Sequence, residues 1–198
     1  ARCAWARRCS YCAASRQASH TDRGYTDHGH TDYQGLLTTR SALLPHCLTC
    51  HKFAGKPLNS VAMLDTLAMQ WSSPQIDGVP PPPRMGCSAS LVGTDVYVFG
   101  GSDGKTSLRD LHVLVYVTWF SPRWKGRAPE PRVGHTCTCV GNRLYVLGGA
   151  SDGRGHNDLH VLDPATQVWS RPVMYGQPPG ALVGHSSVLV GQASYTYY

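Results

Sequence analysis

The chain has 198 residues, of which 41% are apolar and only 15% charged, with 21 glycines and 14 prolines. This balance excludes a disordered chain and a long helix, and it favours an all-β chain with many turns. The net charge of +6 gives no prediction of nucleic-acid binding, because residues 1–57 carry eight Lys or Arg against three Asp, whereas residues 58–198 carry ten basic against nine acidic residues.

Residues 1–52 are expected to form an unstructured, basic leader. Thr-Asp pairs recur every five residues between Thr21 and Asp32, with His residues between them, and such low-complexity sequence buries little apolar surface. Two Cys-x-x-Cys pairs are candidate halves of a zinc site. However, the 34 residues between Cys12 and Cys47 (47 − 12 − 1) exceed the roughly 15–20 of common zinc motifs. We therefore expect disorder and no cofactor here, with a metal-binding tract as the alternative.

The cysteines of the second part indicate the compartment. Cys87, Cys137 and Cys139 lie in apolar, strand-like runs, where cysteine behaves as a small hydrophobic residue. This favours a reducing compartment, and we expect a cytoplasmic protein, with the nucleus as the alternative. No run approaches the ~20 apolar residues that cross a membrane, and the first residues lack the apolar core of a signal peptide, so no membrane insertion is expected.

A repeat becomes recognisable after the leader. Its tail occupies residues 53–71, complete units follow at 84–124 and 132–171, and a further unit starts at 181–198. Equivalent positions of the two complete units lie 48 residues apart, as for Arg132 and Arg84 (132 − 84). Self-similarity at a fixed offset of this size is typical of stacked supersecondary units.

Each unit is predicted to contain four short strands, here called a to d. The sequence is apolar in short runs bounded by Gly, Asn and Pro, as in strands buried between sheets. Strand d lies near Trp71 or Trp169, and Gly-Gly ends strand b. The expected ranges of strands a, b and c in the two complete units are 87–92, 96–99, 111–114, 136–140, 144–147 and 159–162.

This order of motifs resembles the kelch repeat, whose period is about 50 residues. Arg-x-Gly-His, an apolar strand, an apolar-Tyr run into Gly-Gly, Asn-Asp-Leu, and an Asp with a spaced Trp recur over residues 53–191. The resemblance implies an all-β fold: a partial kelch-type β-propeller of four-stranded antiparallel blades over residues 53–198, after the unstructured N-terminal leader. Because a propeller closes with about four to eight blades, we expect a fragment of a longer product, or a chain that pairs with further blades.

The copies also depart from one another. Cys87 stands where the motif has His, Val115 replaces the Asp of the other copies, and Trp119 falls two positions early. We expect the recurring His residues to be structural rather than catalytic, and Trp71 and Trp169 to fill the space between blades. The predicted structural motif residues are Arg84, Gly86, Gly100, Gly101, Arg132, Gly134, His135, Gly148, Gly149, Trp71 and Trp169.

The candidate binding surface follows from strand order. In an up-and-down blade the b–c and d–a loops share one face, and long polar loops on a rigid scaffold commonly carry recognition. Arg154 could bind a carboxylate with two hydrogen bonds; the alternative for all these residues is a solvated turn. The candidate partner-binding residues are Ser102, Asp103, Lys105, Ser151, Asp152, Arg154, His156 and Gln177.

The leading functional hypothesis is a protein–protein interaction module. The sequence contains no nucleophile elbow, P-loop or His-Glu-x-x-His motif, so we predict no catalytic residue, no metal site, no cofactor, and a protein as the partner. The resemblance also extends to galactose-oxidase-like copper enzymes, of which the chain could be a fragment. A truncated gene product without independent activity is the third hypothesis.

Overall fold

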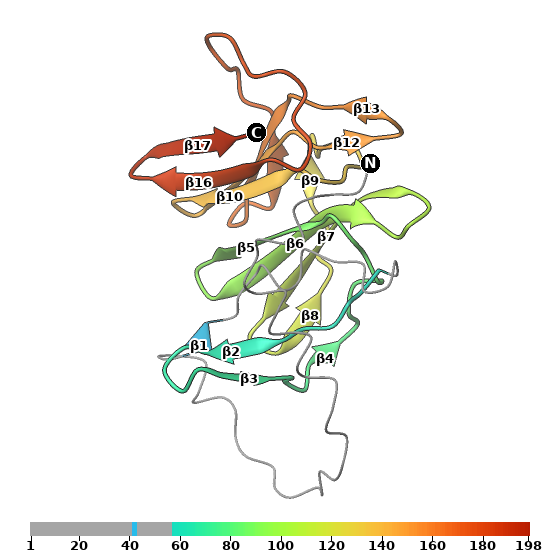
Figure 1. Ribbon diagram of the computed structural model, residues 1–198, viewed down its shortest axis with the longest axis vertical. Helices are drawn as coiled ribbons and strands as arrows, with labels where there is room; N and C mark the ends of the chain where they lie inside the picture. Colours follow the sequence, from blue (N-terminus) through green and yellow to red (C-terminus); the bar gives the residue numbers. More distant parts are fainter. Residues whose placement is uncertain (1–40, 43–56) are drawn as a thin grey trace, which may run out of the picture. The chain divides into compact units, whose positions relative to one another are not determined.

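The computed structural model of the chain describes residues 41–42 and 57–198 (Figure 1). In these residues the chain forms strands and turns and no helix, which confirms the predicted all-β fold. The predictions of a disordered leader and of a Cys-x-x-Cys zinc site fall almost entirely outside the described residues.

The strands are short, and most join their neighbours in sequence as hairpins. Their bounds are β1 Ser41–Ala42, β2 Met63–Asp65, β3 Gln70–Ser72, β4 Asp77–Gly78, β5 Ser88–Val92, β6 Asp95–Ser102, β7 Ser107–Val115, β8 Thr118–Phe120, β9 Lys125–Gly126, β10 Thr136–Val140, β11 Arg143–Leu147, β12 Ala150–Ser151, β13 Arg154–Gly155, β14 Leu159–Asp163, β15 Val168–Ser170, β16 Ser186–Val190 and β17 Ala193–Tyr197.

Two blades are complete within the described residues. In the first, β5, β6, β7 and β8 pair successively as antiparallel neighbours; in the second, β10, β11, β14 and β15 do the same. These are the predicted strands a to d. Each blade gains a fifth strand that the sequence did not predict: β4 pairs in parallel with β8, and β9 with β15. The chain leaving one blade therefore touches the outer edge of the next blade before it enters that blade's first strand.

Half-blades flank the two complete blades. Before them, β2 and β3 form a c–d hairpin in which Leu64 faces Trp71. After them, β16 and β17 form an a–b hairpin. The two-residue strand β1, which falls within the predicted leader, pairs with β2 at Leu64 and Asp65.

The end of strand b differs between the two blades: it lies at the predicted residue in the second blade and three residues later in the first. β6 continues through Gly100 and Gly101 to Ser102, with a shift in register after Phe99. β11 ends at Leu147, and the chain resumes as the small hairpin β12–β13. Gly-Gly therefore marks an irregularity in the strand rather than always its end.

The early position of Trp119 is explained by the turn before it. Trp119 lies opposite Leu114, as Trp169 lies opposite Leu162, so the two tryptophans occupy equivalent places. The turn between β7 and β8 contains two residues, 116–117, whereas that between β14 and β15 contains four, 164–167.

The longer turns depend on an aspartate. Asp163 Oδ1 accepts hydrogen bonds from the backbone N–H of Ala165 and Thr166 at 3.1 and 3.3 Å. Asp65 accepts equivalent bonds from two backbone N–H groups in the turn after β2. Val115 offers no acceptor at this place, which is consistent with its shorter turn.

The main hydrophobic core lies between the two complete blades. Phe99 and Leu111 of the first blade pack with Leu162 and Trp169 of the second. The Trp169 ring lies 5.4 Å from that of Phe99 between centroids, and Trp169 is 3% exposed. Trp71 does not occupy such a space in the described residues, because 45% of it is exposed.

Backbone hydrogen bonds join successive blades through the motif glycines. The Gly134 amide donates to the Gly86 carbonyl at 2.9 Å, and the Gly149 amide donates to the Leu182 carbonyl at 2.7 Å. A Cβ on Gly149 would lie 2.9 Å from both the Val133 carbonyl oxygen and the His135 side chain. Glycine is therefore needed here for the close approach of two segments of the same blade, the end of strand b and the segment that leads into strand a, as well as for its positive φ of 93°.

We expect Gly148→Ala to destabilise the fold more than Gly141→Ala. Both glycines have positive φ, 66° and 60°, so both variants carry a similar conformational cost. Only at position 148 would the new Cβ meet a neighbour, the Leu182 carbonyl oxygen at 2.8 Å. The difference in the free energy of unfolding should be about 1–3 kcal/mol, measured by chemical denaturation. Equal losses would contradict the close-approach explanation.

Candidate interaction surface

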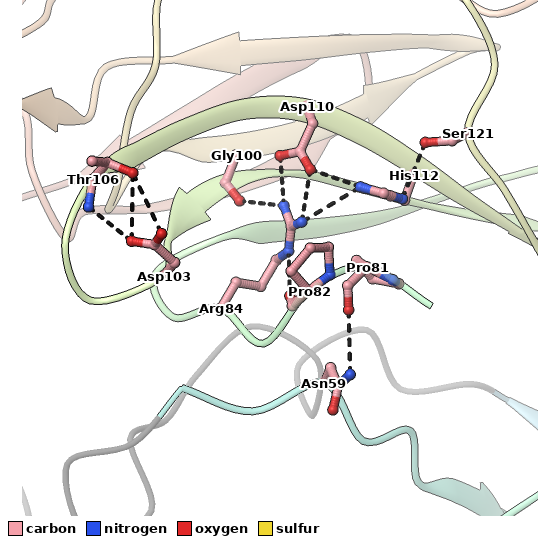
Figure 2. Close-up of polar contacts among 10 residues, drawn as sticks. All are labelled: Asn59, Pro81, Pro82, Arg84, Gly100, Asp103, Thr106, Asp110, His112 and Ser121. Carbon is pink, nitrogen blue, oxygen red and sulfur yellow. Dashed lines mark hydrogen bonds and ion pairs between the residues drawn. The ribbon is translucent and has the colours of Figure 1, made fainter. Parts of the chain in front are cut away.

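An Arg–Asp–His network built on a buried arginine fixes the start of each blade, and Figure 2 shows that of the first blade. Arg84 donates two hydrogen bonds to the Asp110 carboxylate, both 2.8 Å long, and one to the Gly100 carbonyl at 2.9 Å. His112 Nε2 donates to the same carboxylate at 2.7 Å. The network therefore ties the motif arginine to the end of strand b and to strand c.

The second blade repeats the network. Arg132 donates to both carboxylate oxygens of Asp158 at 2.8 and 3.2 Å, and His160 Nε2 donates to Asp158 at 2.9 Å. Burial alone would raise the pKa of Asp158, but the hydrogen bonds and charge of Arg132 and His160 outweigh it and hold that pKa well below its usual range. Arg132, Asp158 and His160 find their hydrogen-bond partners within the blade. We therefore assign them a structural role.

The motif histidine links one blade to the next. His135 Nε2 lies 2.8 Å from Ser88 Oγ of the preceding blade, and its ring packs edge-on against Phe99. Burial, together with the nearby charge of Arg132, lowers the pKa of His135 to about 3. The ring is therefore neutral at physiological pH and cannot act there as a general acid.

This buried neutral imidazole predicts a loss of stability in mild acid. The unfolded chain binds a proton near pH 6.5, whereas folded His135 resists protonation down to about pH 3. Its contribution is thus complete above pH 6.5 and declines as pH falls through this window, by at most about 1.4 kcal/mol per pH unit. His135→Asn should flatten the pH dependence of the free energy of unfolding between about pH 6 and 4, measured by urea titration. An unchanged slope would contradict this assignment.

The first b–c loop uses two of the predicted binding residues to build its own turn. Asp103 Oδ1 accepts hydrogen bonds from the backbone N–H of Lys105 and Thr106, both at 2.8 Å, and Figure 2 shows the contact with Thr106. These bonds lower the pKa of Asp103. Ser102 Oγ accepts a bond from the Gly104 amide at 3.0 Å. Lys105 is exposed and is the residue of this loop best placed to contact a partner.

The second b–c loop is more structured than the first. Its β12–β13 hairpin turns at Asp152 and Gly153, and Arg154 lies exposed opposite Ser151. Ser151 Oγ lies 3.0 Å from His156 Nε2, so two further predicted residues support the loop internally. Arg154 is therefore presented on a hairpin that its neighbours stabilise.

The end of the d–a loop touches this second b–c loop. The Leu182 amide donates to the His156 carbonyl at 3.2 Å, and a Cβ on Gly155 would lie 2.6 Å from the Ala181 side chain. These contacts place one b–c loop and one d–a loop side by side. In the described residues, no hydrogen bond or ion pair joins the two b–c loops to each other.

Of the candidate residues, Gln177 alone lines a groove beside β11 and β17. The groove of about 780 Å³ also contacts Tyr145 of β11 and Ser194 of β17. Sequence reasoning also missed the most exposed apolar residues of the d–a loop, Val173 at 78% and Tyr175 at 93%. The sequence signal that could have found these residues is a short apolar run, Val173 to Tyr175, that lies between a proline and a glycine within a loop.

The described part of the chain has neither a metal cluster nor a membrane-spanning helix. Within residues 41–42 and 57–198, no group of three or more His, Cys, Asp or Glu side chains is arranged to hold a metal ion. These residues therefore provide no set of copper ligands that would support the copper-enzyme hypothesis. No helix of sufficient length and apolar character to cross a bilayer occurs in the same part.

Four-stranded blades, repeated at one offset and joined through a buried core, define a β-propeller repeat protein. The KLHDC2/KLHL20/DRC7 Kelch-repeats domain model matches residues 50–198, more than half of the chain. The chain therefore belongs to the kelch-repeat family. Domains of this family are generally protein–protein interaction modules.

The chain is similar to parts of several curated proteins. Mouse Kelch domain-containing protein 1 is 46% identical over 57 residues, 28% of this chain and 14% of that protein. Arabidopsis thaliana Acyl-CoA-binding domain-containing protein 4 is 38% identical over 136 residues, 67% of this chain and 20% of that protein. Xenopus laevis Rab9 effector protein with kelch motifs is 34% identical over 135 residues, 67% of this chain and 24% of that protein. The chain thus spans a quarter or less of each.

Proposed function

We propose that this chain binds a partner protein through a surface formed by the β12–β13 hairpin and the adjoining d–a loop, residues 171–180. The observation that carries the proposal is the presentation of exposed Arg154 on a hairpin braced by Ser151 and His156. A side chain held on a rigid support loses little conformational entropy on binding.

The chemistry of this surface favours an acidic partner with an accessible apolar group. Arg154 is free to form two parallel hydrogen bonds with a carboxylate. Tyr175, which is 93% exposed, offers a rigid amphipathic ring of the kind that dominates many interfaces. The name of the Xenopus relative describes it as an effector of Rab9, which supports a protein partner in general terms.

Arg154→Ala should weaken partner capture while leaving the fold intact. An exposed loop substitution usually changes stability by less than about 0.5 kcal/mol, whereas loss of an interface hot spot weakens binding by about 2 kcal/mol or more. The measurement is capture of proteins from cell extract by the tagged chain, followed by titration of the recovered partner against each variant.

Arg143→Ala provides a matched control for this test. Arg143 is also exposed, but it begins β11 at the a–b turn and pairs with Asp163 at 3.2 Å. Its loss should leave capture unchanged. Binding that survives Arg154→Ala and Tyr175→Ala together would remove the proposed surface from consideration.

A further inference from the structure

Ser121 is an exposed extension of the Arg–Asp–His network in the first blade. It follows β8 directly and is exposed, whereas the His112 side chain that it contacts belongs to a residue only 8% exposed. Ser121 Oγ lies 3.2 Å from His112 Nδ1, and Figure 2 shows this contact beside the carboxylate of Asp110. A chemical change at the Ser121 hydroxyl would therefore reach a buried ring of the network.

The hydroxyl of Ser121 suits either form of this ring. His112 Nε2 donates to the Asp110 carboxylate at 2.7 Å, which leaves Nδ1 for Ser121. If Nδ1 has no hydrogen, the hydroxyl donates to it; if Nδ1 carries a hydrogen, the hydroxyl oxygen accepts. A group that only accepts hydrogen bonds would instead select the form of His112 with a hydrogen on Nδ1.

The second blade shows that the network accommodates such an acceptor. His160 corresponds to His112 at the 48-residue offset (160 − 48), and its Nε2 also donates to an aspartate, Asp158. Its Nδ1 lies 3.1 Å from the carbonyl oxygen of Arg127. Because a carbonyl oxygen has no hydrogen to donate, the ring of His160 donates from both nitrogens.

Basic side chains follow Ser121 in the link to the second blade. Arg123, Lys125 and Arg127 are exposed, and residues 118–129 contain no Asp or Glu, so their formal charge is +3. Among the described residues, none of these three side chains has an ion-pair or hydrogen-bond partner. The link therefore offers three available cations to an anionic group on Ser121.

Pro122 makes the segment accessible to an enzyme that modifies Ser121. The residue before a proline is held in extended conformations, and many peptide-binding sites take extended segments. In the 198-residue sequence only Ser73 and Ser121, among serines and threonines, precede a proline. Of these two, only Ser121 has the histidine and the basic link.

We propose that Ser121 is a phosphorylation site whose phosphate is held by His112 and the basic link. A Ser-Pro-directed protein kinase would transfer the γ-phosphoryl group of ATP to Ser121 Oγ. The new O–P bond forms, the bond to the ADP leaving group breaks, and the hydroxyl proton passes to a base of the kinase. This inference concerns a modification and does not depend on the proposed partner-binding surface.

The phosphate changes both the hydrogen bonding and the charge of the link. Its oxygens are acceptors, so His112 donates to them from Nδ1 while Nε2 keeps its bond to Asp110. Phosphate carries a charge of about −1.5 to −2 at pH 7, which lowers the formal charge of residues 118–129 from +3 to about +1. The link becomes less basic and is tied to the network that fixes the start of the blade.

Ser73 provides an internal control. It follows the strand-d tryptophan of its blade at the same distance as Ser121 (73 − 71 and 121 − 119), and it is also exposed. However, strand c of that blade has Ala62 where the first blade has His112, at an offset of 50. Residues 74–83 contain one Asp and no Lys or Arg. A phosphate on Ser73 would therefore have no comparable partners.

Two variants of the full chain separate the two serines. Ser73→Ala leaves Ser121 as the Ser-Pro site, and Ser121→Ala leaves Ser73. Each is incubated with ATP and a Ser-Pro-directed kinase, and the phosphate is mapped by mass spectrometry. In the Ser73→Ala chain we expect one phosphate, on Ser121. If Ser121 stays unmodified by a kinase that phosphorylates a peptide of residues 116–127, the proposal is overturned.

Nitrogen-15 NMR of the histidine side chains tests what holds the phosphate. The spectra are recorded at about pH 8, where an ordinary imidazole is neutral. Phosphorylation of Ser121 should move the Nδ1 signal of His112 from that of a nitrogen without hydrogen to that of a nitrogen that carries one. Phosphorylation of Ser73 should move no histidine signal. An unchanged His112 signal would overturn the proposed contact.

Thermal unfolding tests the contribution of the basic link. The phosphate on Ser121 should raise the midpoint of unfolding, and the phosphate on Ser73 should not. Arg123→Ala and Lys125→Ala together should remove most of this rise, because the phosphate loses two nearby cations. Arg143→Ala, which removes an exposed arginine at the a–b turn, is the control and should leave the rise unchanged. Equal shifts from the two phosphates, or a rise that survives loss of both link cations, would contradict the proposal.

Discussion

Trp169→Ala is expected to lower the free energy of unfolding by about 3–5 kcal/mol. Trp169 is 3% exposed and packs against Phe99 of the preceding blade, so its loss leaves a cavity between two sheets that cannot easily collapse. Because a folded domain is stable by only about 5–15 kcal/mol, this one change should remove much of its stability. Thermal and urea unfolding followed by circular dichroism would measure the effect.

Phe120→Ala is the control for this variant. Phe120 is another large aromatic residue in a strand d, but 49% of it is exposed, so it should cost much less than Trp169→Ala. Similar losses from the two variants would show that blade contacts contribute less to stability than the burial of Trp169 indicates.

Asp158→Asn should produce a loss of similar size by an electrostatic route. Arg132 is fully buried and directs two hydrogen bonds to the Asp158 carboxylate. Removing the negative charge leaves a buried guanidinium without its counter-ion, which typically costs about 3–5 kcal/mol. The free energy of unfolding at neutral pH, from urea titration, is the quantity to measure.

The exposed pair of Arg143 and Asp163 is the corresponding control. Breaking it with Arg143→Ala should cost at most about 1 kcal/mol, because solvent screens the interaction. Replacing both Arg132 and Asp158 by apolar residues of similar volume should recover much of the loss seen with Asp158→Asn. A double variant no more stable than the single one would indicate that the network contributes more than charge compensation.

The candidate surface could be located from the sequence only in part. Strand order placed the b–c and d–a loops on one face, and contacts between His156 and Leu182 bring one loop of each kind together. Composition could not show that Asp103 uses its carboxylate to cap its own turn, because a binding aspartate and a turn aspartate look alike in a loop. Exposed Tyr175 was missed, since burial depends on neighbours that are distant in sequence.

The sequence by itself determined the repeat, the fold class and the approximate bounds of the four strands in each blade. These depend on short-range signals: short apolar runs, glycine turns and a fixed 48-residue offset. The sequence also identified Trp119 as an element of the repeat. Its position two residues early is explained only by the structure, in which the turn before it is two residues shorter than the equivalent turn of the second blade.

Only the tertiary structure decided which residues meet across the repeat. Arg84 and Asp110 lie 26 positions apart and pair because the segment before strand a and the start of strand c both meet the end of strand b. β9 joins β15 although Val168 lies 43 positions after its partner Lys125 (168 − 125). A two-residue strand such as β9 is too short to show a periodic pattern of apolar residues. The sequence also does not show which residue pairs with a buried charge, because that depends on how the strands fold. The same limit explains Trp71 and Trp169, which share one motif but differ in burial: what covers a tryptophan is decided by the blade beside it.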